Sequence, residues 1–156
     1  MKPFISKYFI FLLTLLFLLN SCNSTRTALF DQYSYEKTIE LKVETANLIN
    51  KASTPYSCNK QEIENLRLKI EKLIEYEKNK PYNEISFEMW KALNDNERNL
   101  LAGFFKDWEQ KETESKSFII ESKNQILEAF DLLIQYEIKK DKESKDNLLQ
   151  IINLKN

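Results

Sequence analysis

The stretch Ser117–Ile138, SFIIESKNQILEAFDLLIQYEI, decides the fold class. When its residues are placed at about 100° per position, the apolar side chains share one face of a helix. These side chains are Ile119, Ile120, Ile126, Leu127, Phe130, Leu133, Ile134 and Ile138. A segment this long with one apolar face and no Gly or Pro predicts an amphipathic helix that packs against other helices.

A charged stretch, residues 139–146, interrupts the apolar pattern of this segment. The pattern returns in the same helical phase with Leu148, Ile151 and Ile152. The helix therefore either continues through a solvated stretch, or breaks near Asp141 and folds back. We expect it to continue through residues 139–147, because the phase is kept and Gly and Pro are absent.

The segment Ser34–Ala52 predicts a helix with two apolar stripes on nearly opposite sides. The first stripe contains Tyr35, Ile39, Val43, Ala46 and Ile49, and the second contains Leu41, Leu48 and Ala52. A helix with two stripes contacts two neighbours, or one neighbour and an outside partner. We expect Leu41 and Leu48 to form an exposed stripe for a partner protein.

The middle of the chain predicts two further helices and a short one between them. Residues 59–62, NKQE, form a possible capping box before a narrow stripe of apolar residues, and this helix ends near Pro81. The stripe contains Ile63, Leu66, Ile70, Leu73 and Ile74. A short helix is expected at Ser86–Leu93.

A second possible capping box, residues 94–97, precedes five large apolar residues. These residues are Leu100, Leu101, Phe104, Phe105 and Trp108. They could form an aromatic interface, but their angles fill one arc of about 140°, which is typical of a deeply buried helix face. We therefore expect them in the core.

The composition agrees with an all-α domain. The chain contains one glycine, Gly103, and only Pro55 and Pro81 follow the first 21 residues. Sheets with tight turns usually need more Gly and Pro than this. We predict a small bundle of about four main helices, with a short fifth, over residues 31–156.

The N-terminal residues have the order of parts of an export signal. Lys2 and Lys7 precede a short apolar run, residues 9–19, which ends in Leu19-Asn20-Ser21-Cys22. A membrane-spanning helix needs about 20 predominantly apolar residues, so this run is too short to cross a bilayer. We expect residues 1–21 to be a cleaved signal peptide.

The sequence Leu19-Asn20-Ser21-Cys22 resembles the lipobox of bacterial lipoproteins. The resemblance implies cleavage between Ser21 and Cys22, a thioether-linked diacylglycerol on Cys22, and acylation of the new amino group. Residues 22–30 would then be a lipid-anchored tether. Ordinary secretory cleavage and an uncleaved signal anchor are the alternatives. In enteric bacteria an Asp after the lipidated Cys retains such proteins in the inner membrane. Asn23 stands there instead, so we expect the outer membrane, facing the periplasm.

Charge and side-chain chemistry exclude several function classes. The formal charge of −1 becomes −3 once Lys2 and Lys7 are removed, which leaves no basic surface for nucleic acid. The chain has no histidine, and one glycine cannot build a phosphate-binding loop. Glu36, Glu40 and Glu44 stand at i,i+4 spacing, but the lysines among them indicate a solvated surface. We expect no catalytic residue, no metal site and no cofactor.

With Cys22 used for lipid, Cys58 is the remaining thiol, either incidental or bridged to a partner. The sequence thus predicts a non-catalytic binding or structural lipoprotein of the cell envelope. It would contact the membrane through the lipid on Cys22, and a protein partner through its helices. The alternative is an envelope inhibitor that protects against a toxin or a lytic enzyme.

Overall fold

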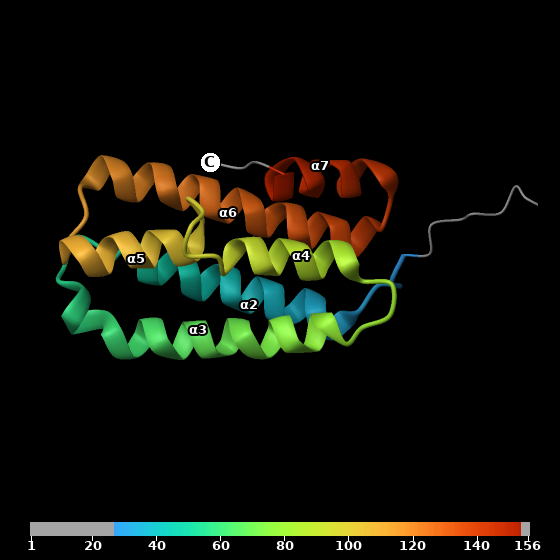
Figure 1. The fold of residues 1–156 in the computed structure, drawn as a ribbon, viewed down its shortest axis with the longest axis horizontal. Coiled ribbons are helices and arrows are strands. Elements are labelled where there is room, and N and C mark those ends of the chain that lie inside the picture. The colour runs from blue at the N-terminus through green and yellow to red at the C-terminus, as the bar shows by residue number, and fades with distance from the viewer. Residues whose placement is uncertain (1–26, 154–156) are drawn as a thin grey trace, which may run out of the picture.

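Six α-helices form the part of the chain that the computed structural model describes, residues 27–153, and this part contains no strand (Figure 1). The helices are α2 (Gln32–Ile49), α3 (Tyr56–Lys78), α4 (Glu84–Leu93), α5 (Leu101–Lys111), α6 (Lys116–Lys139) and α7 (Lys142–Asn153). The all-α class is confirmed, whereas the count of about four main helices is not. The predicted signal peptide 1–21, its cleavage site Ser21–Cys22 and the lipidation site Cys22 lie outside the described residues.

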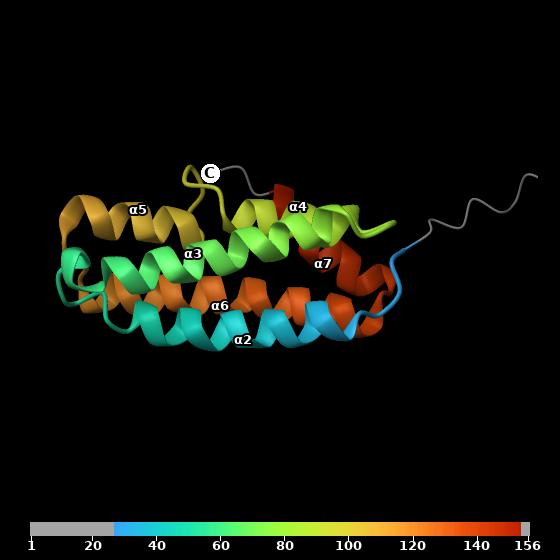
Figure 2. The same cartoon turned by 90° about the horizontal axis from the view of Figure 1, so that it is seen from below.

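The helices run alongside one another and enclose one core. α2 packs against α3 and α6, while α4 and α5 follow each other along one side of the bundle and both contact α3 (Figures 1 and 2). The largest buried side chains come from α4, α5 and α6, and the rings of Trp90 and Phe130 meet edge to face with centroids 5.6 Å apart. None of the helices in residues 27–153 is long and apolar enough to cross a bilayer.

The apolar face predicted for α5 lies in the core. All five of its large residues are 5% exposed or less, and Phe105 and Trp108 are fully buried. The core interpretation of this aromatic segment is therefore confirmed. The stripe of α3 is also confirmed, with Ile74 only partly buried at its edge.

The predicted exposed stripe of α2 is wrong. Leu41 and Leu48 are 2% and 4% exposed, and they belong to the core. Part of the other stripe reaches solvent instead, since Val43 is 55% exposed and Ile39 36%, whereas Ile49 is fully buried. The error has a physical reason: α2 lies between α3 and α6, and the small polar residues Ser34 and Thr38 share the buried face with the leucines.

Both predicted capping boxes are also wrong. α3 begins at Tyr56, directly after Pro55, and Asn59 lies inside the helix, where its side-chain amide donates to the Pro55 carbonyl oxygen at 3.1 Å. Proline fits this position because its fixed φ suits a helix entry and it lacks an N–H. α5 begins at Leu101, after a turn in which Asp95 Oδ1 accepts a hydrogen bond from the Glu97 N–H at 2.9 Å.

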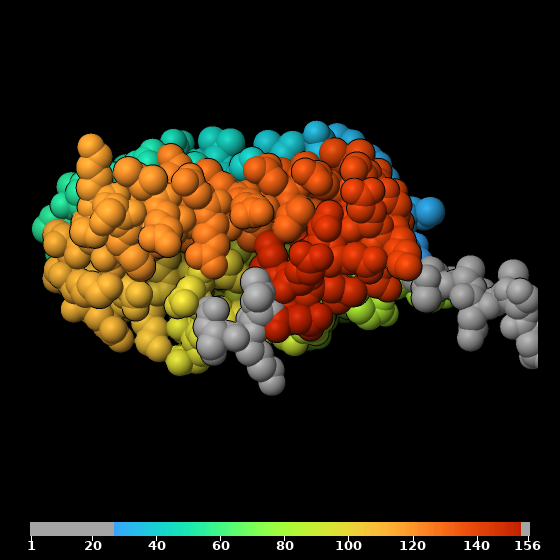
Figure 3. Space-filling model, turned by 90° about the horizontal axis from the view of Figure 1, so that it is seen from above, coloured from blue at the N-terminus to red at the C-terminus, as the bar shows by residue number. Residues whose placement is uncertain are grey.

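The continuous helix expected through residues 139–147 is not formed. α6 ends at Lys139, Lys140 adopts a left-handed conformation with φ 49°, and α7 folds back along α6 (Figure 3). Ser144 donates from its backbone N–H to Asp141 Oδ1 at 2.8 Å, near the start of α7. The reversal buries Leu148 completely against α4 and α6, whereas a continuous helix would leave it in solvent.

Candidate functional site

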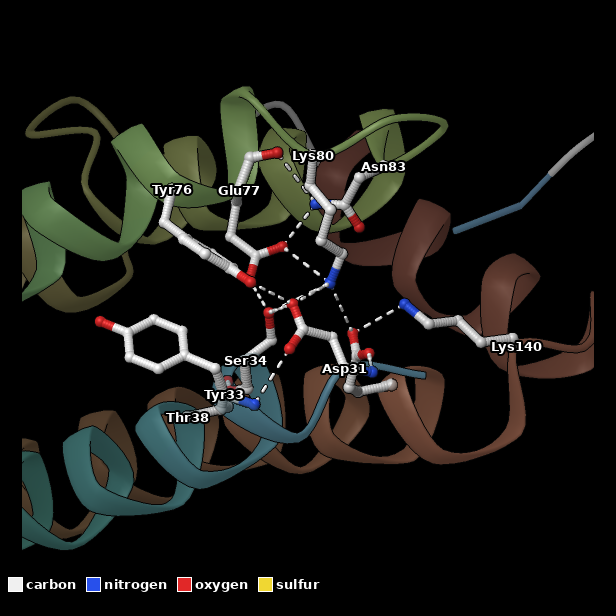
Figure 4. Close-up of polar contacts among 10 residues, drawn as sticks. Asp31, Tyr33, Ser34, Thr38, Tyr76, Glu77, Lys80, Asn83 and Lys140 are labelled. Atoms are coloured by element: carbon white, nitrogen blue, oxygen red, sulfur yellow. Dashed lines mark hydrogen bonds and ion pairs between the residues drawn. The ribbon is translucent and has the colours of Figure 1, made fainter. Parts of the chain in front are cut away.

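One end of the bundle is closed by buried charged side chains (Figure 4). We call it the tether end, and it comprises residues 27–34, 75–84 and 136–143. Its polar cluster, here the Lys80 cluster, takes residues from the start of α2, the end of α3, the α3–α4 loop and the end of α6. The members are Asp31, Ser34, Tyr76, Glu77, Lys80, Asn83, Glu137 and Lys140.

Lys80 lies at the centre of this cluster. Its Nζ is 3.3 Å from Asp31 Oδ2, 3.6 Å from Glu137 Oε2 and 3.7 Å from Glu77 Oε2. It also donates a hydrogen bond to Ser34 Oγ at 3.0 Å. Glu77 and Glu137 are 1% and 4% exposed, so this ammonium compensates two carboxylates that water barely reaches.

Asp31 combines a helix cap with an ion pair. Its Oδ1 accepts from the Tyr33 backbone N–H at 3.0 Å, and its Oδ2 accepts from the Tyr76 hydroxyl at 2.7 Å. Burial by itself would raise the pKa of Asp31. The hydrogen bond from Tyr76, the charge of Lys80 and the Ser34 hydroxyl outweigh burial and lower the pKa to about 2. The same hydrogen bond raises the pKa of Tyr76 to about 12.

Glu77 joins α3 to the start of both α2 and α4. The side-chain amide of Asn83 donates to the Glu77 carboxylate and, at 3.0 Å, to the Glu77 backbone carbonyl. The Ser34 hydroxyl lies within hydrogen-bonding distance of Glu77 and of Asp31, and its single hydrogen can be donated to one of them at a time. Glu77 is thereby held by the start of α2 and by the α3–α4 loop.

Glu137 joins the end of α6 to the N-terminal segment. Its Oε1 accepts from the Asp31 backbone N–H at 2.7 Å, and its Oε2 accepts from Lys140 Nζ at 2.7 Å. Lys140 Nζ also lies 4.7 Å from the centroid of the Tyr136 ring. Burial is the main cause that lowers the pKa of Lys140, against the opposing effect of Glu137.

The cluster is built to hold elements together. Each of its three carboxylates accepts hydrogen bonds from other segments of the chain, and Lys80 contacts all three. In the described residues 27–153, no group of three or more His, Cys, Asp or Glu side chains is arranged to hold a metal ion.

An apolar groove of about 540 Å³ lies beside the Lys80 cluster. Its walls come from two segments that a backbone hydrogen bond joins, from the Ala28 N–H to the Tyr82 carbonyl oxygen at 2.9 Å. The lining residues are Thr27, Ala28, Leu29, Asp31, Lys80, Pro81 and Tyr82. The N-terminal segment is thus bound to the bundle from Ala28 onward.

The three glutamates at i,i+4 spacing, Glu36, Glu40 and Glu44, lie on the surface of α2. Glu40 pairs with Lys37 at 2.5 Å, and Glu44 pairs with Lys69 of α3. Cys58 lies in the first turn of α3 and is exposed.

The sequence reasoning missed the Lys80 cluster altogether. The sequence pattern predicts only a helix end near Pro81. A possible signal was the density of polar side chains around Pro81, where Glu77, Lys80 and Asn83 stand at three-residue spacing.

Comparisons with known proteins gave no match. No protein-family model matches the chain, and neither a curated protein nor a solved structure is significantly similar to it.

Proposed function

We propose that this chain is a lipid-anchored lipoprotein of the bacterial cell envelope, in which a helical domain acts as a non-catalytic binding or structural protein. The lipobox-like residues Leu19–Cys22 support the anchor. The expected location is the outer membrane, with the domain facing the periplasm.

The lipobox-like residues carry the proposal. The attachment of the N-terminal segment to the bundle limits how far the domain could lie from such an anchor. Ala28 is 6% exposed and is held by its backbone hydrogen bond to Tyr82. Only residues 23–27 separate Cys22 from this point. At up to ~3.6 Å per residue the six steps from Cys22 to Ala28 reach roughly 22 Å, so a lipid on Cys22 would keep the tether end at the bilayer surface. Partners of the domain would have to be present there.

Mass spectrometry of protein expressed from the full chain tests the anchor. The expected N-terminal peptide begins at Cys22 and carries a diacylglycerol and an amide-linked acyl chain, and the protein sediments with membranes. The Cys22→Ser variant, which lacks the thiol, should carry no lipid. An unmodified Cys22 thiol in a protein that washes freely into solution would contradict the proposal.

Two experiments separate a binding role from an inhibitor. Crosslinking in intact cells should recover envelope proteins attached to the domain. A deletion strain should show no selective sensitivity to lysozyme or envelope toxins if the protein is structural, whereas an inhibitor predicts such sensitivity.

A further inference from the structure

Exposed apolar side chains gather at the tether end. Ten large hydrophobic residues of the described chain are exposed, and six of them lie at this end. We call these six the end patch: Leu29, Phe30, Tyr33, Tyr76, Tyr82 and Ile138. Two of the six, Leu29 and Tyr82, line the apolar groove. Single exposed apolar residues are ordinary, whereas a group of them at one end of a molecule marks an interaction surface.

The composition of the end patch fits a lipid–water boundary. Leu29 is 86% exposed and Phe30 is 50% exposed, so both present hydrocarbon to the outside. The rings of Tyr33 and Tyr76 pack together with centroids 4.7 Å apart, and both are partly exposed. Tyrosine is enriched at membrane–water interfaces, because its ring is apolar and its hydroxyl forms hydrogen bonds; that of Tyr76 donates to Asp31.

We propose that the end patch rests on the phospholipid bilayer, so that the bundle stands with its tether end against the membrane. This inference rests on the proposed lipid anchor. The chain between Cys22 and the bundle is short, so a lipid on Cys22 allows the tether end to move at most roughly 22 Å from its attachment point. The bilayer is therefore the surface that the end patch is expected to contact. Leu29 and Phe30 follow almost directly after this short connection.

The charges at the tether end indicate what drives the contact. The exposed cations Lys78, Lys139 and Lys142 are accompanied by four exposed acids, which are Glu75, Glu84, Asp141 and Glu143. This end therefore has no excess positive charge for attraction to anionic lipid. The contact would depend on burial of apolar side chains, and we expect it to be equal on zwitterionic and anionic bilayers.

Quenching of a tryptophan by brominated lipid tests the contact. The mature lipidated protein is reconstituted in phosphatidylcholine vesicles whose acyl chains carry bromine, with either Leu29→Trp or the control Leu68→Trp. Leu68 is 50% exposed near the middle of α3. Interfacial side chains enter ~5–10 Å into the headgroup–acyl boundary, so quenching of the Leu29→Trp protein should exceed that of the control by about twofold. Trp90 and Trp108 contribute the same buried background to both proteins.

The outcomes distinguish this inference from the proposed anchor. Selective quenching at position 29, unchanged when phosphatidylglycerol is added, supports the bilayer contact. Equal quenching at positions 29 and 68 in protein whose Cys22 carries lipid overturns it, and this is the result expected if the end patch binds a protein or a second copy of the chain. An unmodified Cys22 in the same preparation instead overturns the anchor. Circular dichroism of both variants checks that they are folded.

Discussion

Lys80 connects three segments through one ammonium group. It faces carboxylates from the start of α2, the end of α3 and the end of α6, and its side chain is 12% exposed. Taking charges out of water is costly, so such a cluster adds little net stability over an apolar packing of the same shape. Removal of one partner is different, because the remaining charges stay buried without compensation.

Substitution of Lys80 by Met therefore predicts a large loss of stability. The variant leaves three carboxylates, those of Asp31, Glu77 and Glu137, with Lys140 as the remaining ammonium of the cluster, and we expect the free energy of unfolding to fall by about 3 kcal/mol. Urea denaturation measures this change. The control Lys78→Met removes an exposed lysine, and its effect should stay within about 0.5 kcal/mol. Equal effects of the two variants would show that Lys80 is not a central counter-ion.

The lowered pKa of Asp31 makes the stability of the fold depend on pH. Its pKa is about 2 in the folded chain and near its ordinary value of 3.8 in the unfolded chain, so its ionised form favours folding. This contribution, about 2 kcal/mol, is fully present above pH 4 and is lost as the pH falls to 2. Asp31→Asn can still cap α2 but has no charge. It should be less stable than the native chain by that amount at pH 7 and equal to it near pH 2.

Denaturation curves of both proteins between pH 7 and pH 2 check this expectation. Asp146→Asn, on the exposed side of α7, is the matched control and should change stability little at any of these pH values. A deficit of Asp31→Asn that stays constant down to pH 2 would contradict the role of the Asp31 charge.

At the scale of elements, the apolar stripes of α3 and α5 were predictable, whereas those of α2 and the helix ends were not. The stripe of α6 was only partly right, because Ile120 and Ile138 are 52% and 54% exposed. The 3.6-residue period identified the buried faces of α3 and α5, because burial of large side chains dominates there. The period gave the wrong face for α2, since Ser34, Thr38 and Thr45 are buried and no apolar pattern includes them. The capping patterns predicted the wrong helix starts, because the same polar side chains can form hydrogen bonds in a turn instead. Asp95 does so when it accepts from the Glu97 N–H before α5.

The single glycine of the chain explains how α5 enters the bundle. A Cβ on Gly103 would lie 1.9 Å from the Arg98 carbonyl oxygen, a contact with backbone that cannot move aside easily. Gly103→Ala should therefore lower the free energy of unfolding by about 2 kcal/mol or more, although alanine is the better helix former. Thermal denaturation measures the change, with Gln110→Ala on the exposed end of α5 as the control. A gain in stability for Gly103→Ala would refute this close approach.

The hydrogen bonds at the turn between α6 and α7 are expected to affect the stability of α7 alone. Asp141 accepts hydrogen bonds from the backbone N–H and the hydroxyl of Ser144, and these bonds lower its pKa. Asp141→Ala should loosen the first turn of α7, so that its amides exchange hydrogen faster while those of α6 do not change. Glu143→Ala, two residues further along the chain, is the control. Faster exchange throughout the bundle would indicate a different role for Asp141.

At the scale of the whole molecule, the two ends of the bundle are closed by different chemistry. The end opposite the tether end is closed mainly by an aromatic side chain and by backbone hydrogen bonds, together with one ion pair in which Lys111 Nζ lies 3.2 Å from Oε1 of the buried Glu114. Trp108 Nε1 donates to the Thr54 and Glu112 carbonyl oxygens at 3.0 and 3.1 Å, and the Tyr56 N–H donates to the Glu112 carbonyl oxygen at 2.8 Å. The tether end is closed by ionised side chains. Helix periodicity cannot predict this cluster, because its members lie up to 109 positions apart in the chain and charged residues ordinarily face solvent.

This difference predicts that acid loosens the tether end before the opposite end. Between pH 4 and pH 2 protonation of Asp31 weakens the Lys80 cluster, while the hydrogen bonds of Trp108 do not titrate. Hydrogen-exchange protection should therefore fall first for amides at the start of α2 and the end of α3. Protection at Tyr56 should persist over this range. Simultaneous loss at both ends would show that the bundle responds to acid as one unit.

The hydrogen bonds of the N-terminal segment also determine how the domain bears mechanical load. A pull on the chain at residue 27 meets the Ala28–Tyr82 backbone bond first and the Asp31–Glu137 bond next, before it reaches the first turn of α2. The force therefore acts first on the α3–α4 loop and then on the last turn of α6, before it can unwind α2 from its tip. With the proposed lipid on Cys22, a domain pulled by the membrane would in this way resist being opened from its N-terminal end.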